Sequence, residues 1–285
     1  MASDRRSRPP APAAGTGPAG EARATRPPGP VAVAVAAVLL AWVTLAVLHG
    51  GAWTDLDHAV SEQVRRTGVR AAEWPQPLFW PKLGVYAVTQ LGAWLPVLAV
   101  LVPFVGWVSW RRQTWRPLFR LAVAAGLLVA TVYTVKVGVG RTPPATDVLH
   151  SPTGRSFPSG HLPTAVVCWG LAAWLAAEHR LAAWLRGPLA VARWAAPALT
   201  CAAMLLLDYH WLSDLVAGLA LGVLLLRVLH LVDAATLRNW RNERGRPPSE
   251  PGGDRGAPAE IGGPAPAHSG VAGVPRRGGV PTAGA

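Results

Sequence analysis

Apolar residues gather along the middle of the chain in six blocks, which short polar stretches separate. Each block is close to the roughly twenty residues that a helix needs to cross the hydrocarbon core of a bilayer. The blocks cover residues 31–48, 83–108, 118–137, 161–177, 189–207 and 210–231. This pattern predicts an all-α integral membrane protein, built as a bundle of six transmembrane helices.

The two ends of the chain lack this apolar pattern. Residues 1–30 and 236–285 are rich in Pro, Ala, Gly and Arg, a composition that buries too little apolar surface to offset the entropy of ordering a chain. We therefore expect a disordered tail on either side of a six-span domain at residues 31–235. The first block follows a long polar tail without a convincing cleavage site, so we interpret it as an uncleaved anchor.

Basic residues are unevenly distributed among the connections between blocks. They precede block one, join blocks two and three and blocks four and five, and follow block six: Arg5, Arg6, Arg8, Arg23, Arg26, Arg111, Arg112, Arg116, Arg180, Arg186, Arg238, Arg241 and Arg244. Because such residues mark cytoplasmic connections, we expect a multi-pass protein of the plasma (inner) membrane with both termini in the cytoplasm. Residues 51–82, 138–160 and the turn near Asp208 would then be extracytoplasmic.

This topology also accounts for the net charge of +12, because cytoplasmic arginines are attracted to anionic lipid. Membrane lipids are therefore the expected partners, and nucleic acid is not. Within the first extracytoplasmic connection, Leu56, Ala59, Val60 and Val64 recur at helical spacing between charged residues. They favour an amphipathic helix on the outer membrane surface, although an ordinary solvated connector also fits this pattern.

Two polar clusters lie at the edges of apolar blocks, on the same predicted side of the membrane. The first, residues 155–161, ends in Ser159-Gly160-His161, and the second covers residues 208–214. If Ser159 caps the helix that begins at His161, its hydroxyl and the adjacent backbone N–H groups will face an anion such as phosphate. In the second cluster, His210 and Asp214 are four residues apart, so a carboxylate can orient the imidazole for nucleophilic attack.

Three basic residues lie near these clusters. Lys136 lies close to the outer end of an apolar block, where a charged side chain is costly and is a functional candidate by default, although a lysine that snorkels to the interface also fits. Arg141 and Arg155 lie in the connection that follows. A site for a phosphoryl group, built from two helix ends and these cations, is therefore expected.

These residues resemble a known family. Lys136, Pro158-Ser-Gly-His161 and the pair His210 and Asp214, in this order across six predicted spans, are similar to the type 2 phosphatidic acid phosphatase superfamily of membrane lipid phosphatases. The resemblance covers residues 31–231. It implies that His210 attacks phosphorus to give a phosphohistidine, that Asp214 orients His210, and that His161 protonates the leaving oxygen.

The resemblance further implies that Lys136, Ser159 and Gly160 bind the phosphoryl group. No metal and no cofactor is expected, because fixed cations and amides stabilise the charge on the transferring group. Two arginines of the family's motifs are absent, since Pro143 and Met204 occupy their positions. We expect Arg141 and Arg155 to replace them as phosphate ligands.

The leading hypothesis is a metal-independent phosphatase that acts on a lipid-linked phosphate or pyrophosphate: a polyprenyl pyrophosphate, phosphatidic acid or phosphatidylglycerol phosphate. Its substrate would approach laterally between helices. A non-catalytic membrane protein of the same fold that binds lipid phosphate headgroups is the alternative. A transporter is disfavoured because the charged residues line one end of the bundle instead of a midplane path. Six spans also disfavour the soluble vanadium-dependent haloperoxidases, which share the phosphate-site motifs.

Overall fold

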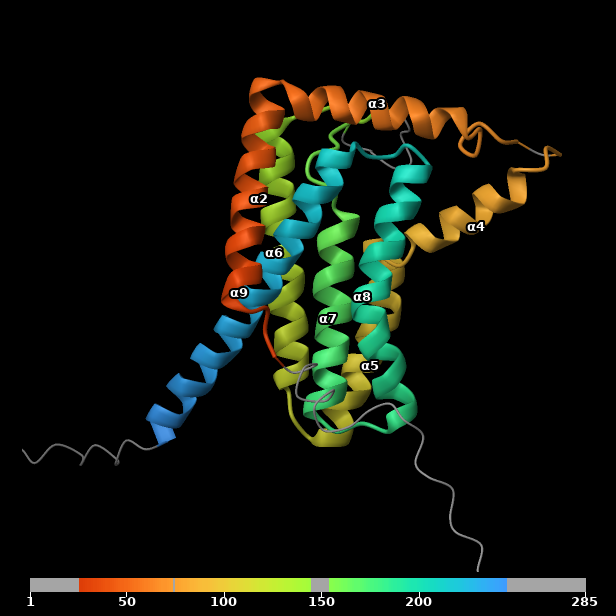
Figure 1. The fold of residues 1–285 in the computed structure, drawn as a ribbon. Helices are drawn as coiled ribbons and strands as arrows, with labels where there is room; N and C mark the ends of the chain where they lie inside the picture. Colours follow the sequence, from red (N-terminus) through yellow and green to blue (C-terminus); the bar gives the residue numbers. More distant parts are fainter. Residues whose placement is uncertain (1–25, 74, 145–153, 245–285) are drawn as a thin grey trace, which may run out of the picture. The chain divides into compact units, whose positions relative to one another are not determined.

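The computed structural model describes residues 26–73, 75–144 and 154–244, with side chains up to residue 238. The regular elements of these residues are helices (Figure 1). They are α2 (Pro30–His49), α3 (Ala52–Arg66), α4 (Phe79–Thr89), α5 (Trp94–Arg112), α6 (Arg116–Val139), α7 (His161–Glu178), α8 (Ala183–Leu206) and α9 (Leu212–Arg244). The all-α prediction is confirmed. Helix α9 continues beyond the predicted domain boundary at residue 235, and most of both predicted tails lies outside the described residues.

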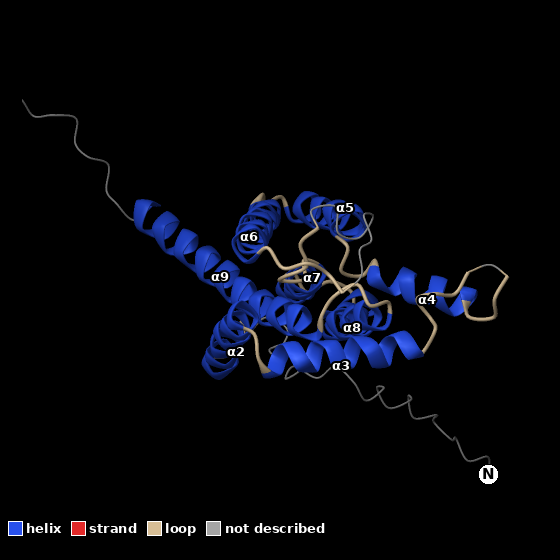
Figure 2. Cartoon of the chain, turned by 90° about the horizontal axis from the view of Figure 1, so that it is seen from above, coloured by secondary structure: helices blue, strands red, loops and turns tan. Residues whose placement is uncertain are grey.

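Five of these helices are long and apolar enough to cross a membrane: α2, α5, α6, α8 and the Leu212–Arg238 part of α9. The sixth predicted span, α7, is not among them, and most of its side chains are buried among the other helices. Viewed from above, α7 lies between α5, α6, α8 and α9 (Figure 2). A multi-pass membrane protein is therefore supported, while six spans and the orientation in the membrane stay predictions.

The block predicted at residues 83–108 is not one helix. Helix α4 ends at Thr89 and α5 begins at Trp94, with a turn between them. Gly92 in this turn passes so close to α7 that a Cβ atom there would lie 2.6 Å from the backbone oxygen of His161. The apolar run is interrupted because this turn packs against the first residue of α7, a tertiary contact that hydropathy does not report.

Helices α7 and α9 approach closely through two glycines of α9 that are four residues apart. A Cβ atom at Gly218 would lie 2.9 Å from the backbone oxygen of Ser159, and one at Gly222 would lie 2.9 Å from Cα of Pro163. Small residues at this spacing let helix backbones pack side by side in a membrane. The beginnings of the two helices that carry the polar clusters are thereby held together.

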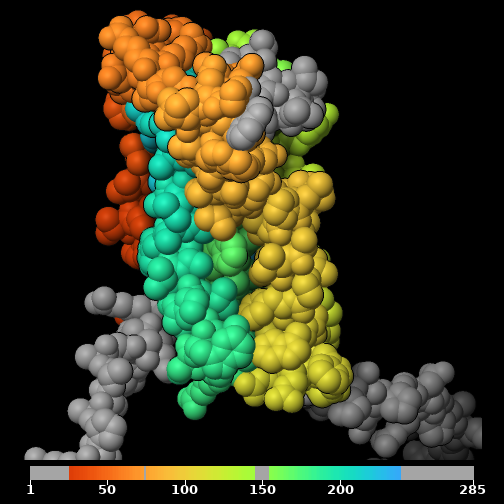
Figure 3. Space-filling view, turned by 90° about the vertical axis from the view of Figure 1, so that its right-hand side faces the viewer, coloured from red at the N-terminus to blue at the C-terminus, as the bar shows by residue number. Residues whose placement is uncertain are grey.

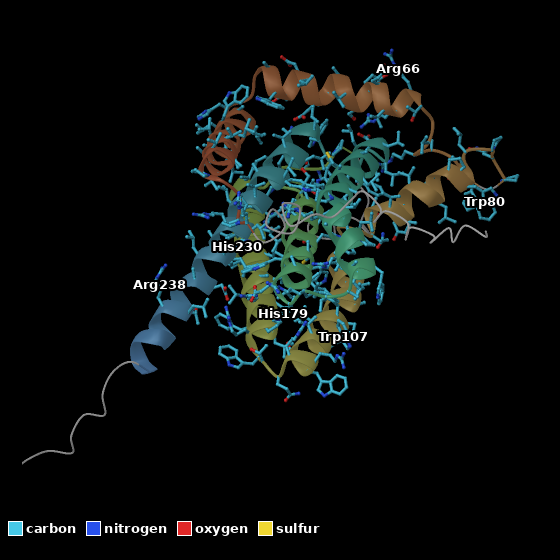
Figure 4. All side chains as sticks on the ribbon, turned by 60° about the horizontal axis from the view of Figure 1, so that its bottom comes forward. Arg66, Trp80, Trp107, His179, His230 and Arg238 are labelled. Atoms are coloured by element: carbon cyan, nitrogen blue, oxygen red, sulfur yellow. The ribbon has the colours of Figure 1, made fainter. Side chains whose placement is uncertain are left out.

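A buried ion network joins three helices at the other end of the bundle. The guanidinium of Arg120 in α6 donates to Asp233 of α9 through Nε and Nη2, at 2.8 Å each, and its Nη1 donates to Glu178 of α7 at 2.7 Å. The same guanidinium lies 4.1 Å from the ring centre of Trp174, which stacks on His230 (labelled in Figure 4). A charge in this interior is tolerated because it is paired on two sides.

Helix α3 confirms the helix expected near residues 55–70, but the side that it buries is different. It runs across the end of the bundle where α7 and α9 begin (Figure 1). Its buried residues are Asp57 and Ser61, whereas Leu56 of the predicted apolar face is 44% exposed. The polar side of α3 therefore packs on the protein.

Candidate active site

The structure brings the two predicted clusters together. The imidazole rings of His161, at the start of α7, and His210, just before α9, have centroids 6.4 Å apart and planes inclined by 65°. The backbone N–H of Ser159 donates to the backbone oxygen of Asp214 at 3.1 Å, which ties the first cluster to the second. Residues about fifty positions apart thus form one site at the beginnings of two packed helices.

His210 and Asp214 form the pair that their spacing predicts. Nδ1 of His210 lies 3.4 Å from Oδ2 of Asp214, and the backbone N–H of Trp211 donates to the same oxygen at 3.2 Å. Asp214 is fully buried, and His210 is 7% exposed. A carboxylate at Nδ1 leaves Nε2 as the nitrogen for chemistry.

The sequence suggested that Ser159 caps α7, but the structure does not show this. The N-cap residue is Gly160, and no side chain caps the helix. The Ser159 hydroxyl is buried, and its Oγ has no hydrogen-bond partner within the described part of the chain. A buried hydroxyl in this state is uncommon, and a phosphate oxygen beside the helix start would satisfy it.

Lys136 and Arg155 lie next to each other. Nζ of Lys136 donates to the backbone oxygen of Arg155 at 2.7 Å. Both side chains are partly exposed. The lysine reaches the site from α6, which makes α6 the third helix, after α7 and α9, to contribute a predicted site residue.

Arg141 is held by two carboxylates. Its Nη1 donates to Oδ1 of Asp214 at 3.0 Å, and its Nη2 donates to Oδ2 of Asp57 at 2.7 Å. Arg141 is one of the residues predicted for the site, whereas Asp57, which comes from α3, is not. A signal was present in the spacing of Asp57, Ser61 and Arg65, which recur every four residues along α3.

An apolar cavity of about 520 Å³ leads to the two histidines. Lys136, Gly160, His161 and His210 line its polar part. Its apolar walls come from the α4–α5 turn and from α5, α6 and α7, including Gly92, Trp94, Leu98, Leu121, Ala125, Leu128, Val129 and Cys168. On the side of the bundle that faces the viewer in Figure 3, part of α7 is visible between α5 and α8.

The described residues contain no group of three or more His, Cys, Asp or Glu side chains that is placed to hold one metal ion. The expectation that the reaction needs no metal stays a prediction.

The family of the chain follows from its match to a protein-family model. The model of the PAP2 superfamily matches residues 95–237, slightly more than half of the chain. The chain belongs to the PAP2 superfamily. The match runs from α5 into α9 and includes every predicted site residue, whereas α2, α3 and α4 precede it.

A solved PAP2 structure has the same fold. The crystal structure of a transmembrane PAP2-type phosphatidylglycerolphosphate phosphatase from Bacillus subtilis superposes with a TM-score of 0.58 at 20% sequence identity. The alignment covers 71% of this chain and 96% of the other. No curated protein matches the chain significantly.

This PAP2 protein differs from its family where two arginines are expected. Met204 is 1% exposed and packs with Leu162 and Leu215 in a core between α7, α8 and α9. An arginine would have to place its charge among these apolar side chains, which is costly without a partner. The position at which the resemblance leads one to expect an arginine is therefore part of the core.

Proposed function

We propose that this PAP2 protein is a membrane phosphatase that removes phosphate from a lipid-linked phosphate or pyrophosphate through a phosphohistidine at His210. The observation that carries the proposal is the pair of imidazoles, His161 and His210, with centroids 6.4 Å apart in the polar part of an apolar cavity. Both rings line this cavity, so one bound phosphoryl group is proposed to contact both. An apolar cavity with a few convergent polar groups is the usual form of a lipid or small-molecule site.

The two histidines divide the reaction between them. Nε2 of His210 attacks phosphorus while Asp214 holds Nδ1–H, so a P–N bond forms as the bond from phosphorus to the lipid oxygen breaks. His161 gives its proton to the departing oxygen. In the second half, His161 takes a proton from water, the water oxygen attacks phosphorus, the P–N bond breaks and inorganic phosphate leaves.

The charge on the transferring group is stabilised by groups around the start of α7. Lys136, Ser159 and Gly160 are the proposed contacts, together with Arg155. The beginning of α7 adds partial positive charge at the same place through the dipole of the helix. Arg141 is paired with Asp57 and Asp214, so its proposed contact is with Asp214 instead of with phosphate.

The cavity supports a substrate with a long apolar chain. Its α6 wall uses Leu121, Ala125, Leu128, Val132 and Lys136, which share one face of that helix. The fifteen residue steps from the first to the last of these cover about 22 Å at the helical rise of about 1.5 Å per residue. This length exceeds the roughly 15 Å of hydrocarbon in one leaflet, so a chain lying in the membrane can enter from the side while its phosphate reaches the histidines.

The arginine distribution supports an extracytoplasmic site with both termini in the cytoplasm. A polyprenyl pyrophosphate, phosphatidic acid and phosphatidylglycerol phosphate all combine an apolar chain with a terminal phosphate, so all three belong to the proposed substrate class.

The proposed function is tested with the full-length protein purified in detergent. Phosphate release is measured from a panel of these three lipids, with and without a chelator of divalent cations. We expect release from at least one lipid and the same rate in the presence of chelator. Loss of activity with chelator would contradict the metal-independent mechanism. Absence of release from every lipid would reject the phosphatase and favour the headgroup-binding alternative.

The apolar cavity leads to a second prediction, which concerns the length of the substrate's apolar chain. Ala125→Trp fills the apolar wall of the cavity, so we expect the KM for a long-chain lipid phosphate to rise about tenfold, the loss for roughly two buried methylene groups. The KM for a short-chain, water-soluble phosphate should stay close to that of the wild type. Ala130→Trp is the matched control, because Ala130 lies on the exposed side of the same helix. Equal effects of the two variants on the KM for the long-chain lipid would contradict binding of the substrate chain in this cavity.

A further inference from the structure

Helix α3 presents a polar stripe to the site. Asp57, Ser61 and Arg65 are four residues apart and share one side of the helix. The Ser61 hydroxyl donates to Oδ1 of Asp208 at 2.7 Å, and Nε of Arg65 donates to Oδ2 of the same carboxylate at 2.9 Å. Asp208 belongs to the turn that leads to His210 and has a positive φ of 54°. The stripe therefore holds the turn that carries the proposed nucleophile.

Asp57 makes the most extensive contacts of this stripe. It is 1% exposed, and its Oδ1 accepts from the backbone N–H of Ser213 at 2.9 Å. Its Oδ2 accepts from the Ser213 hydroxyl at 2.5 Å and from Nη2 of Arg141 at 2.7 Å. Ser213 is in the first turn of α9, so Asp57 satisfies one of the free N–H groups of that helix from a different helix.

Arg141 extends this contact to the proposed catalytic pair. Its Nη1 donates to Oδ1 of Asp214, and the other oxygen of Asp214 faces Nδ1 of His210. The guanidinium also lies 5.1 Å from the ring centre of Trp211. The carboxylate of Asp57, the guanidinium and the carboxylate of Asp214 thus alternate in charge along one line of contacts that ends at His210.

We propose that Asp57 is a positioning residue for the reaction at His210. It fixes the direction of the Arg141 guanidinium and the first turn of α9, so that Asp214 keeps one oxygen on Arg141 and turns the other toward His210. Without the carboxylate, Arg141 has a charge partner only in Asp214 among these residues, and the orientation of Asp214 is no longer fixed from both sides. This inference rests on the proposed function.

The contacts also assign a role to an element outside the family match, since α3 precedes residue 95. Burying a carboxylate is costly unless its hydrogen bonds are all made, and Asp57 makes three. The distribution of charge is consistent with this assignment. Arg66 and Glu62 pair with each other on α3 at 3.4 Å and are both exposed, and Arg66 points away from the bundle (Figure 4).

The test compares Asp57→Asn with Glu62→Gln, a matched exchange of carboxylate for amide on the exposed side of the same helix. Steady-state kinetics are measured with the lipid that the wild type hydrolyses best. We expect Asp57→Asn to lower kcat by about 10- to 100-fold with KM within about twofold of the wild type, the pattern for a group that acts on the transition state. Glu62→Gln should change neither constant by more than about twofold. Asp57→Glu, which keeps the charge, should retain a kcat between those of Asp57→Asn and the wild type.

A double variant tests the path through Arg141. If Asp57 acts through Arg141, the combined loss of kcat in Asp57→Asn/Arg141→Gln will be no larger than the larger single loss. Additive losses would overturn this path. An unchanged kcat in Asp57→Asn, or a raised KM at unchanged kcat, would overturn the positioning role. Should Asp57→Asn prove too unstable in a detergent melting experiment, Arg141→Gln alone decides, because a loss in kcat supports the proposal and a loss confined to KM contradicts it.

The wild-type measurement separates this inference from the function on which it rests. Absence of phosphate release by the wild type would reject the proposed function and the role of Asp57 with it. Wild-type activity together with an unchanged kcat in Asp57→Asn would reject the role of Asp57 alone.

Discussion

Replacing His210 by alanine is expected to lower phosphate release by about 10⁴-fold or more, because the substitution removes the proposed nucleophile itself. The ring of His210 is held by Asp214 and is buried beside the apolar cavity, and a water molecule in its place would not reproduce this geometry. At the conversion of about 1.4 kcal/mol per factor of ten, the loss corresponds to about 5.5 kcal/mol of transition-state stabilisation. The measurement is the initial rate of phosphate release in detergent with the preferred lipid.

A second readout identifies the covalent step. A substrate labelled with radioactive phosphate should leave acid-labile, alkali-stable label on the wild-type protein after rapid quenching, and none on His210→Ala. His49→Ala is the control, since His49 lies in the last turn of α2, is exposed and is absent from the cavity lining. Activity of His210→Ala within tenfold of the wild type would contradict a phosphohistidine at this position.

The meeting of the two polar clusters could be predicted because each lies where an apolar helix begins. Helix starts offer unsatisfied N–H groups and attract anions, and a His–Asp pair at a spacing of four is brought onto one side of the chain. The structure agrees with this prediction, because His161 lies close to His210 and Ser159 lies close to Asp214. These contacts depend on local sequence and on helix packing through Gly218 and Gly222, both visible in the sequence.

The features of the fold that the sequence did not predict depend on which helix surfaces pack against each other. Hydropathy reads residues 83–108 as one span, but the turn at Gly92 is fixed by its close approach to His161. Likewise, Arg120 lies within an apolar block, and only the arrangement of α6, α7 and α9 supplies Glu178 and Asp233 as its partners. The periodicity of apolar residues along the sequence does not show which residues of different helices come into contact.

Asp57 illustrates the same limit inside the site. The apolar positions of α3 favoured an amphipathic helix on the outer membrane surface, with its polar side toward water. The buried carboxylate is stabilised there by Ser213 and Arg141, which are distant in sequence and which a reading of α3 alone does not connect with it.

The leaving group gives the sharpest test of His161. The leaving group of a phosphate monoester is an alkoxide, which is too basic to depart without a proton. The leaving group of a lipid pyrophosphate is the lipid monophosphate, which is stable as an anion. We therefore expect His161→Gln, which keeps much of the side-chain volume but cannot donate an acidic proton, to lower kcat by about 10³-fold on phosphatidic acid. On a polyprenyl pyrophosphate the loss should be about tenfold, because that leaving group needs less protonation.

The comparison is made on one preparation of each variant, with kcat measured for the monoester and the pyrophosphate in the same detergent. His49→Gln serves as the matched control and should leave the ratio of the two kcat values unchanged, since its side chain is exposed at the end of α2. The ring centres of His161 and His210 are 6.4 Å apart and both residues line the same cavity, so His161 is the proposed proton donor to the leaving oxygen. Equal losses on both substrates would instead mean that His161 binds the phosphoryl group and that the proton comes from another group.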